Sequence, residues 1–209
     1  MPARTNIIKK TLRGITKAHK DYENWSGLWL CTGPEYMITT YIAKEIATNT
    51  GHYVTLEQDA KESIKEAGGP GSGKFTEDTR RKFEGGRFDI VVWDGDTPVT
   101  IIEVKNQPRG FSGKNGIKGD VDNICRVLKG ENSFQYGLVA YYSALKKINT
   151  VSAVKRTSGR VDYIKSAADA RIKEKGGLEL RQHPSHPKPQ VVEDSAWIGV
   201  VLQISKSRQ

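Results

Sequence analysis

The segment RFDIVVWDGDTPVTIIEVK, residues 87–105, decides the fold that we expect for this chain. Residues 87–94 and 99–105 are rich in valine and isoleucine, which favour β-strands. Between them, residues 94–98 read DGDTP, a cluster typical of a tight turn. Two apolar runs separated by such a cluster predict a β-hairpin.

Three charged side chains interrupt this apolar hairpin. Side chains alternate between the two faces of a strand, so Glu103 and Lys105 share one face of the second strand. If Trp93 pairs near Val99, Asp89 on the first strand falls opposite Glu103. We therefore expect two carboxylates and one lysine to converge at the open end of the hairpin.

Charges in such an apolar setting are costly unless they are paired or bound to a metal. Asp89 and Glu103 would repel each other, and a divalent cation such as Mg²⁺ removes that repulsion. Lys105 can contact a scissile phosphate, stabilise developing charge or help to deprotonate a metal-bound water. These residue types suit metal-assisted hydrolysis of a phosphodiester bond. The alternative is an ordinary ion pair between Glu103 and Lys105 at a sheet edge.

The stretch GGRFDIVVWDGDTPVTIIEVKNQ, residues 85–107, resembles the core of the PD-(D/E)XK nuclease superfamily. The resemblance implies an α/β domain with a restriction-endonuclease-like mixed β-sheet flanked by helices. It also implies that Asp89 and Glu103 hold the metal and that Lys105 assists catalysis. Phe88 stands where the motif has a proline, a departure that is common in this divergent superfamily.

In this superfamily the first helix often contributes a glutamate to the metal site. The resemblance covers roughly residues 33–145, and residues 33–51 predict that helix through isoleucines at every fourth position. Glu35 lies about 20° from Ile42 around the helix axis and faces the core side. Glu45 lies roughly 60° from the same line. We therefore expect Glu35 to complete the metal site, with Glu45 as the alternative.

Periodicity and turn residues predict the other elements. Residues 59–86 are charged and glycine-rich and read as a loop, and residues 181–190 read as a proline-rich connection. Asp120 and Asp122 are most simply first-turn acids that face a helix dipole. The remaining elements are a strand at 52–58, a helix at 120–130, a strand at 134–144, a helix at roughly 160–175 and a strand at 196–204.

The length and composition indicate one domain over residues 1–209, and the resemblance implies that this domain is nuclease-like. We expect it to carry a basic N-terminal arm at about 1–30 and a C-terminal extension at about 146–209. The net charge of +9 favours a polyanionic partner, and nucleic acid is the commonest one. The sequence has no apolar run of the length of a membrane span or signal peptide, and it has two cysteines. We therefore expect a cytoplasmic protein without a membrane partner. A homodimer or a larger protein complex stays open.

Residues 68–74 read GGPGSGK and match the spacing of a phosphate-binding loop. Such a loop needs a buried strand before it and a Ser or Thr after its lysine, whereas here a charged segment precedes it and Phe75 follows. A P-loop NTPase is therefore the less favoured alternative. Four polar residues are candidates for contact with nucleic acid: Lys74, Arg80 and Arg81 in the charged loop, and Gln107 just after the motif strand.

The combined expectation is a nuclease that uses Mg²⁺, replaceable by Mn²⁺, to hydrolyse phosphodiester bonds in DNA through a metal-bound water. The expected metal ligands are Asp89, Glu103 and Glu35, and Lys105 is the further catalytic residue. The choice of DNA over RNA follows from the tendency of the superfamily alone. The main alternative is a nucleic-acid-binding protein of the same fold that does not cut.

Overall fold

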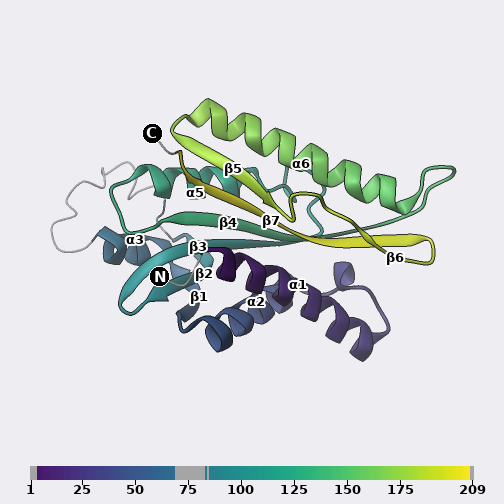
Figure 1. Cartoon of the computed structure of the whole chain (residues 1–209), viewed down its shortest axis with the longest axis horizontal. Helices are drawn as coiled ribbons and strands as arrows, with labels where there is room; N and C mark the ends of the chain where they lie inside the picture. The colour runs from purple at the N-terminus through teal and green to yellow at the C-terminus, as the bar shows by residue number, and fades with distance from the viewer. Residues whose placement is uncertain (1–3, 69–82, 84, 208–209) are drawn as a thin grey trace.

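The fold is described by a computed structural model that covers residues 4–68, 83 and 85–207. Helices and strands alternate along most of this chain (Figure 1). In chain order the elements are α1 (Arg4–Ser26), η1 (Leu30–Thr32), α2 (Glu35–Thr50), β1 (Tyr53–Asp59), α3 (Ala60–Gly68), β2 (Arg87–Asp94), β3 (Thr97–Asn106), α5 (Lys118–Lys129), β4 (Tyr136–Lys146), α6 (Ala153–Lys175), β5 (Leu178–His183), β6 (Gln190–Val192) and β7 (Ser195–Lys206).

The strands form one mixed, seven-stranded open sheet. Its order is β1-β2-β3-β4-β7-β5, and β6 pairs with β7. Strands β3 and β4 run parallel, and the other paired strands run antiparallel. A parallel pair needs a crossover, and α5 provides it between β3 and β4. The expectation of an α/β chain with a mixed sheet between helices is confirmed.

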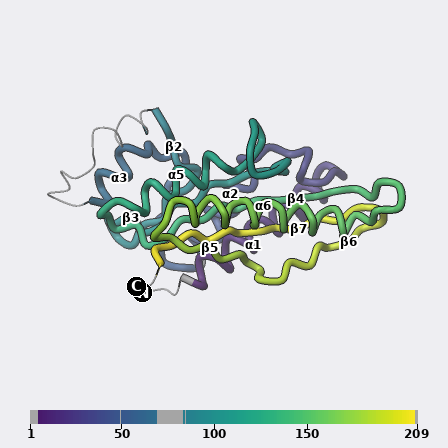
Figure 2. Tube along the Cα trace, turned by 90° about the horizontal axis from the view of Figure 1, so that it is seen from above, coloured from purple at the N-terminus to yellow at the C-terminus, as the bar shows by residue number. Residues whose placement is uncertain are grey.

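The central strands are apolar on both faces. On β4, Leu138 and Ala140 pack in the core with α1 and α2, whereas Val139 and Tyr141 pack in the core with α3, α5 and α6. Figure 1 shows α5 and α6 above the sheet and α1 and α2 below it. From above, α6 runs lengthwise along β5 and β7 (Figure 2). Because both faces are covered, these strands read as apolar runs instead of alternating patterns.

The hairpin forms as predicted and sets the register of the candidate site. Strand β2 coincides with residues 87–94, and β3 extends the predicted second strand at both ends. Ile90 pairs with Ile102, and the same register places Asp89 opposite Glu103. A β-bulge after Val92 shifts the pairing beside the turn by one residue. The bulge lies on the turn side, so it leaves the open end of the hairpin in register.

The N-terminal segment is part of the folded core, and its prediction as a basic arm is wrong. Helix α1 buries one stripe of side chains at the spacing of a helix face. That stripe consists of Ile7, Ile8, Thr11, Ile15, Ala18 and His19. The lysines and arginines that suggested an arm lie between these positions, on the solvent side of the same helix.

The C-terminal residues are equally integral, because β7 lies between β4 and β5 in the sheet. Residues 181–190 were predicted as a plain connection, yet they include the end of β5 and the start of β6. Both strands form because β7 offers hydrogen-bonding partners on that side. Such pairing between distant segments leaves little trace in a short, proline-rich sequence window.

Helix α3 occupies residues that read as a loop. The side chain of Asp59 accepts a hydrogen bond from the Glu62 amide at 2.8 Å and caps the helix. Its apolar residues are few, but Ala60, Ile64 and Ala67 all lie buried on one side. The charged residues between them masked this stripe in the sequence.

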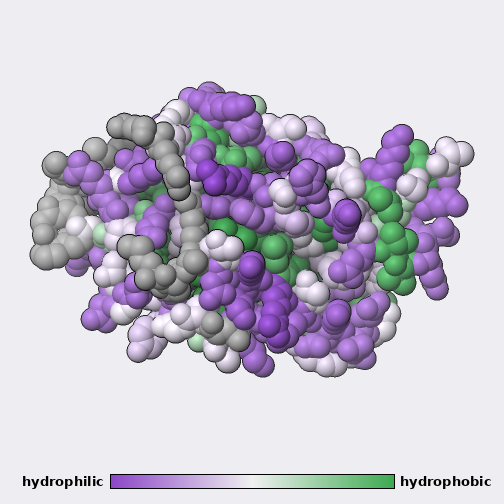
Figure 3. Space-filling view, viewed as in Figure 1, coloured by the Kyte–Doolittle hydropathy of each residue, from purple (hydrophilic) through white to green (hydrophobic). Residues whose placement is uncertain are grey.

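The described surface is mostly hydrophilic on the face seen in Figure 3. Hydrophobic residues gather at the right-hand end of that view, over the β4–α6 connection and β6. The exposed residues there include Ile148, Val151, Val191 and Val192. Within residues 4–68, 83 and 85–207, no helix has both the length and the apolar character to cross a membrane.

Candidate active site

The centre of the candidate site is a pair of carboxyl groups at the open end of the hairpin. Asp89 Oδ2 accepts a hydrogen bond from the Val104 amide at 2.7 Å, which holds its side chain against β3. The carboxyl of Glu103 hydrogen-bonds that of Asp89, and its side chain is only 5% exposed. Burial, then the charges of Asp89 and Asp120, raise the pKa of Glu103 well above its ordinary value. The pair therefore retains a proton unless another cation takes its place.

Lys105 lies next to this pair and contacts two further carboxylates. Its Nζ is 3.5 Å from Glu35 Oε1 and 3.6 Å from Asp120 Oδ1. Burial alone would lower the pKa of Lys105, but the surrounding carboxylates outweigh it and raise the pKa above the ordinary value. Lys105 is therefore a cation at neutral pH, suited to stabilise negative charge and unsuited to accept a proton.

Asp120 belongs to this site although the sequence suggested only a first-turn acid. It lies in the first turn of α5, and the crossover returns that turn to the end of β3. Burial raises the pKa of Asp120 to about 6, against the opposing effect of Lys105. Its Oδ2 atom is buried without a hydrogen-bond partner among the described residues. The sequence signal that could have pointed to Asp120 is its place at the start of the helix following the motif strand.

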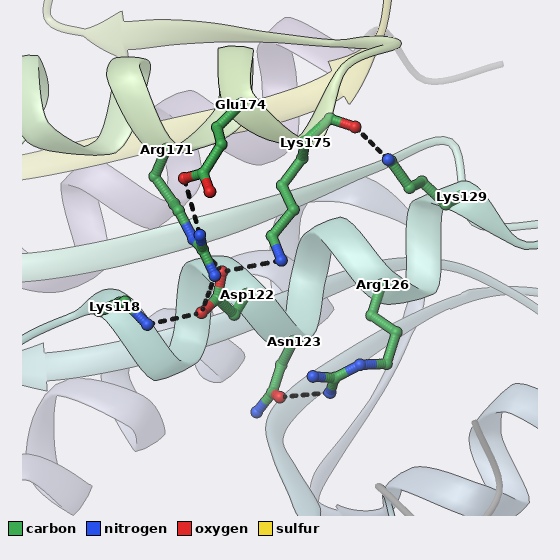
Figure 4. Close-up of polar contacts among 8 residues, drawn as sticks. All are labelled: Lys118, Asp122, Asn123, Arg126, Lys129, Arg171, Glu174 and Lys175. Carbon is green, nitrogen blue, oxygen red and sulfur yellow. Dashed lines mark hydrogen bonds and ion pairs between the residues drawn. The ribbon is translucent and has the colours of Figure 1, made fainter. Parts of the chain in front are cut away.

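Asp122, two residues after Asp120, forms an ion-pair network between α5 and α6 (Figure 4). Asp122 accepts from Arg171 at 2.7 and 3.1 Å and from Lys118 at 3.1 Å, and Lys175 lies 3.8 Å away. Burial raises the pKa of Asp122, but hydrogen bonds from Arg171 and Lys118 outweigh it and hold the pKa below its usual value. The network ties α5, whose first turn carries Asp120, to α6.

Glu35 begins α2 and reaches the end of β3 from the other layer of helices. Its Oε2 accepts a hydrogen bond from the Asn106 amide at 2.7 Å. The Asn106 side chain in turn donates from Nδ2 to the carbonyls of Leu30 and Gly33, both at 2.8 Å. Asn106 thus fixes the chain that leads into α2, a role that sequence reasoning missed. A lone Asn after the motif carries no specific signal for it.

Glu45, the alternative acid on α2, has different partners. It is 5% exposed and forms ion pairs with two side chains of α1. Arg13 Nε lies 3.2 Å from Glu45 Oε2, and Lys17 donates to Glu45 Oε1. Of the two candidate glutamates, only Glu35 is an ion-pair partner of Lys105 among the described residues.

Gln107 completes the pairing of β3 with β4. Its amide N–H donates to the Tyr142 carbonyl at 2.8 Å. Its side chain donates to the Ala144 carbonyl and accepts from the Ala144 amide at 2.6 Å. These bonds occupy the side chain with a structural role, and its contact with nucleic acid stays a prediction.

The other nucleic-acid candidates, Lys74, Arg80 and Arg81, lie outside the described residues, as does most of the GGPGSGK stretch. The part before that stretch is described, and it is helix α3, which ends at Gly68. A phosphate-binding loop follows a buried strand, so the helix argues against that alternative.

The site as a whole has an excess of negative charge. Asp89, Glu103, Asp120 and Glu35 contribute four carboxyl groups, and Lys105 contributes one ammonium, so full ionisation leaves three uncompensated negative charges. Among the residues that the structure describes, no three His, Cys, Asp or Glu side chains already stand as a ready metal site. Magnesium commonly takes one or two carboxylates, with waters and phosphate for the rest. The Asp89–Glu103 pair and the unpartnered Asp120 Oδ2 fit that requirement.

Comparison with known proteins finds no relative: no protein-family model, no curated protein and no solved structure matches the chain.

Proposed function

We propose that this protein is a metal-dependent nuclease of the PD-(D/E)XK type, with a restriction-endonuclease-like fold, that hydrolyses phosphodiester bonds in DNA. The observation that carries the proposal is the pairing of Asp89 with Glu103 beside Lys105 at the open end of the hairpin. The choice of DNA over RNA depends on the resemblance of the motif to that superfamily.

Each residue of the site has a separate role in this proposal. Asp89 and Glu103 would hold Mg²⁺, which when bound supplies Lewis-acid polarisation of the phosphate and an activated water. Lys105 stays protonated and stabilises the charge that develops on the phosphate oxygens. Glu35 and Asp120 hold the Lys105 ammonium from two sides. Metal binding by Glu35 remains part of the proposal as an additional ligand.

Two helix N-termini support the binding of a phosphate at this place. Glu35 is the first residue of α2, and Asp120 lies in the first turn of α5, so both helices begin beside Lys105. Amide groups and the helix dipole favour anions at such ends. With a cation on the carboxyl pair to offset the negative charge of the site, a phosphate approaching Lys105 would also meet the amide groups of these two helix ends.

Cleavage assays test the proposal directly. Plasmid, single-stranded DNA and RNA are each incubated with the protein in Mg²⁺, in Mn²⁺ and in EDTA. We expect cleavage of DNA in either metal and none in EDTA. Lys105→Ala should lower the cleavage rate by roughly a hundredfold or more, as for loss of a charge-stabilising group. The matched control is Lys165→Ala, which removes an exposed lysine from α6 and should cut at the wild-type rate.

Two results would overturn parts of this proposal. Cleavage by Lys105→Ala at the wild-type rate would remove the assigned mechanism. Retention of DNA without cleavage in either metal would instead indicate the binding protein of the same fold. Titration with ATP and GTP, followed by intrinsic fluorescence, should give no saturable change if the P-loop alternative is wrong.

A further inference from the structure

Three arginines lie together on the α6 side of the sheet, beyond the candidate site. Arg156 and Arg160 are one turn apart in the first half of α6, and Arg109 belongs to the segment that follows β3. Tyr163 is three residues beyond Arg160, so the three α6 residues share one helix face. The Tyr163 side chain is 59% exposed. We call these four residues the arginine cluster.

The segment that carries Arg109 is a folded part of the surface. The Arg109 amide donates to the Asn115 carbonyl at 3.1 Å, and Phe111 is buried in the core. Gly110 lies against α6, because a Cβ atom at this position would be 3.3 Å from Tyr163 Cε1. These contacts hold the segment against the face of α6 that bears the other members of the cluster.

The three guanidinium groups have no carboxylate partner among the described residues. Arg156 donates only to the Lys146 carbonyl there, and neither Arg109 nor Arg160 forms an ion pair with a described side chain. Burial, and then the charges of Arg156 and Arg109, lower the pKa of Arg160. Arg171 in the second half of the same helix differs, because it pairs with Asp122 and Glu174 (Figure 4). Uncompensated arginines at close quarters favour an anionic partner.

The arginine cluster is also within reach of a substrate in the candidate site. Arg109 follows Lys105 by four residues, so their Cα atoms are at most about 14 Å apart. At about 3.4 Å per nucleotide along a strand, this distance corresponds to no more than about four nucleotides. A strand with one phosphate at Lys105 can therefore place another phosphate at the cluster.

We propose that the arginine cluster binds a single-stranded segment of nucleic acid, with Arg109, Arg156 and Arg160 on its phosphates and Tyr163 stacked on a base. Arginines beside an exposed aromatic ring are the combination that proteins use for single strands. The inference rests on the proposed function, because it extends the substrate path from the site that would cut it.

Binding in EDTA separates this inference from cleavage. A fluorescein-labelled single-stranded DNA 20-mer is titrated with each variant at several salt concentrations, and anisotropy is measured. Arg156→Ala with Arg160→Ala should weaken binding tenfold or more and reduce the slope of log K against log salt by about 1.4, the value for two phosphates. Tyr163→Ala should weaken binding roughly tenfold with little change in slope, because stacking releases few counterions.

The control variant carries Arg181→Ala with Lys188→Ala, which removes the same charge from exposed positions. Leu180 packs on the α6 side of β5, so its neighbour Arg181 points to the opposite face. This control should bind within twofold of wild type. Arg160→Gln tests the cluster without touching the bond from Arg156 to Lys146, and it should weaken binding severalfold.

The outcomes distinguish the two proposals. If wild type binds the oligonucleotide and the arginine variants bind equally well, the cluster is not the binding surface, while the nuclease proposal stands on its cleavage assay. If a duplex 20-mer binds as tightly and Tyr163→Ala has no effect, the assignment to single strands is wrong. If wild type binds vesicles containing phosphatidylserine but no oligonucleotide, the cluster serves a membrane surface and the inference fails.

Discussion

At the scale of single residues, the site is governed by carboxyl groups whose pKa values are raised in the fold. Glu103 is buried beside Asp89, and Asp120 is buried beside Lys105. A carboxyl whose folded-state pKa lies above its unfolded value favours the folded state at low pH. That contribution is lost as the pH rises through the raised pKa. Without a metal, the site therefore costs stability at neutral pH.

Asp120→Asn should stabilise the protein at high pH. In EDTA at pH 8, we expect the free energy of unfolding to rise by about 1 to 3 kcal/mol, because the cost of ionising Asp120 is removed. The gain should shrink as the pH falls through about 6 and should disappear near the ordinary value of 3.8. Urea unfolding followed by circular dichroism between pH 4 and 8 measures this dependence.

Asp122→Asn is the control with the opposite sign, since its pKa is lowered in the fold. The ionised Asp122 carboxyl of the wild type stabilises the fold above its unfolded pKa, and this effect is lost as the pH falls. Asp122→Asn should therefore be less stable than wild type at pH 8. Equal pH profiles for the two variants would contradict the assigned electrostatics.

Substitution of the two glutamates of α2 should have different effects, one on activity and the other on stability. Glu35→Gln should slow cleavage while leaving the unfolding transition nearly unchanged, because its side chain is 42% exposed. Glu45→Gln should cost about 1 to 3 kcal/mol of stability, since it leaves Arg13 and Lys17 without their buried acid. Cleavage assays and thermal melts on both proteins check the pair. If Glu45→Gln instead slowed cleavage and left stability unchanged, the roles assigned to Glu35 and Glu45 would be reversed.

At the scale of elements, the position of α2 depends on a close crossing with α1. A Cβ atom on Gly14 would lie 2.6 Å from Ile42 Cα and 2.8 Å from Ile42 N. No side chain fits there without moving one helix. Because Glu35 begins α2, the distance between these helices also sets the position of Glu35 relative to Lys105.

Gly14→Ala should therefore destabilise the protein by about 1 to 3 kcal/mol through overpacking. Gly159→Ala is the matched control, because Gly159 lies inside α6 with nothing within 4 Å of an added Cβ. This change should stabilise by about 0.5 to 1 kcal/mol, the ordinary gain of alanine over glycine in a helix. Chemical unfolding measures the stability of both variants. A Gly14→Ala variant as stable as wild type would show that α1 can shift freely.

The link between α5 and α6 provides a second prediction at this scale. Arg171→Ala should lower the midpoint of thermal unfolding and also slow cleavage, because the turn that holds Asp120 loses its anchor (Figure 4). Lys173→Ala breaks an exposed pair with Asp169 on the same helix and should leave the midpoint within about one degree. If both variants changed the midpoint and the cleavage rate equally, Arg171 would not be the anchor of the turn that holds Asp120.

At the scale of the whole molecule, one sheet separates two cores, and each core needs helices from its own side. Helix α1 supplies much of the cover for one face, with Ile7, Ile8 and Ile15 nearly inaccessible to solvent. A chain that begins at residue 27 should therefore expose this face and lose cooperative thermal unfolding. Differential scanning calorimetry tests this, and a sharp transition from the truncated chain would restore the view of residues 1–30 as a dispensable arm.

The sequence alone determined the features that depend on short-range pattern. The hairpin, the register of Asp89 with Glu103, and the helix over Glu35–Thr50 all follow from periods of two and about four residues between clear turn signals. The placement of Lys105 beside the carboxyl pair came from the same alternation.

Only the tertiary structure decided the features that depend on crossovers and on pairing between distant segments. It brought Asp120 to Lys105 through the α5 crossover, paired Glu35 with Lys105, and made β7 a central strand. It also gathered the arginine cluster from two separate segments. The physical reason is that periodicity shows which face of an element is apolar, whereas the neighbour of that face is chosen by packing the whole chain.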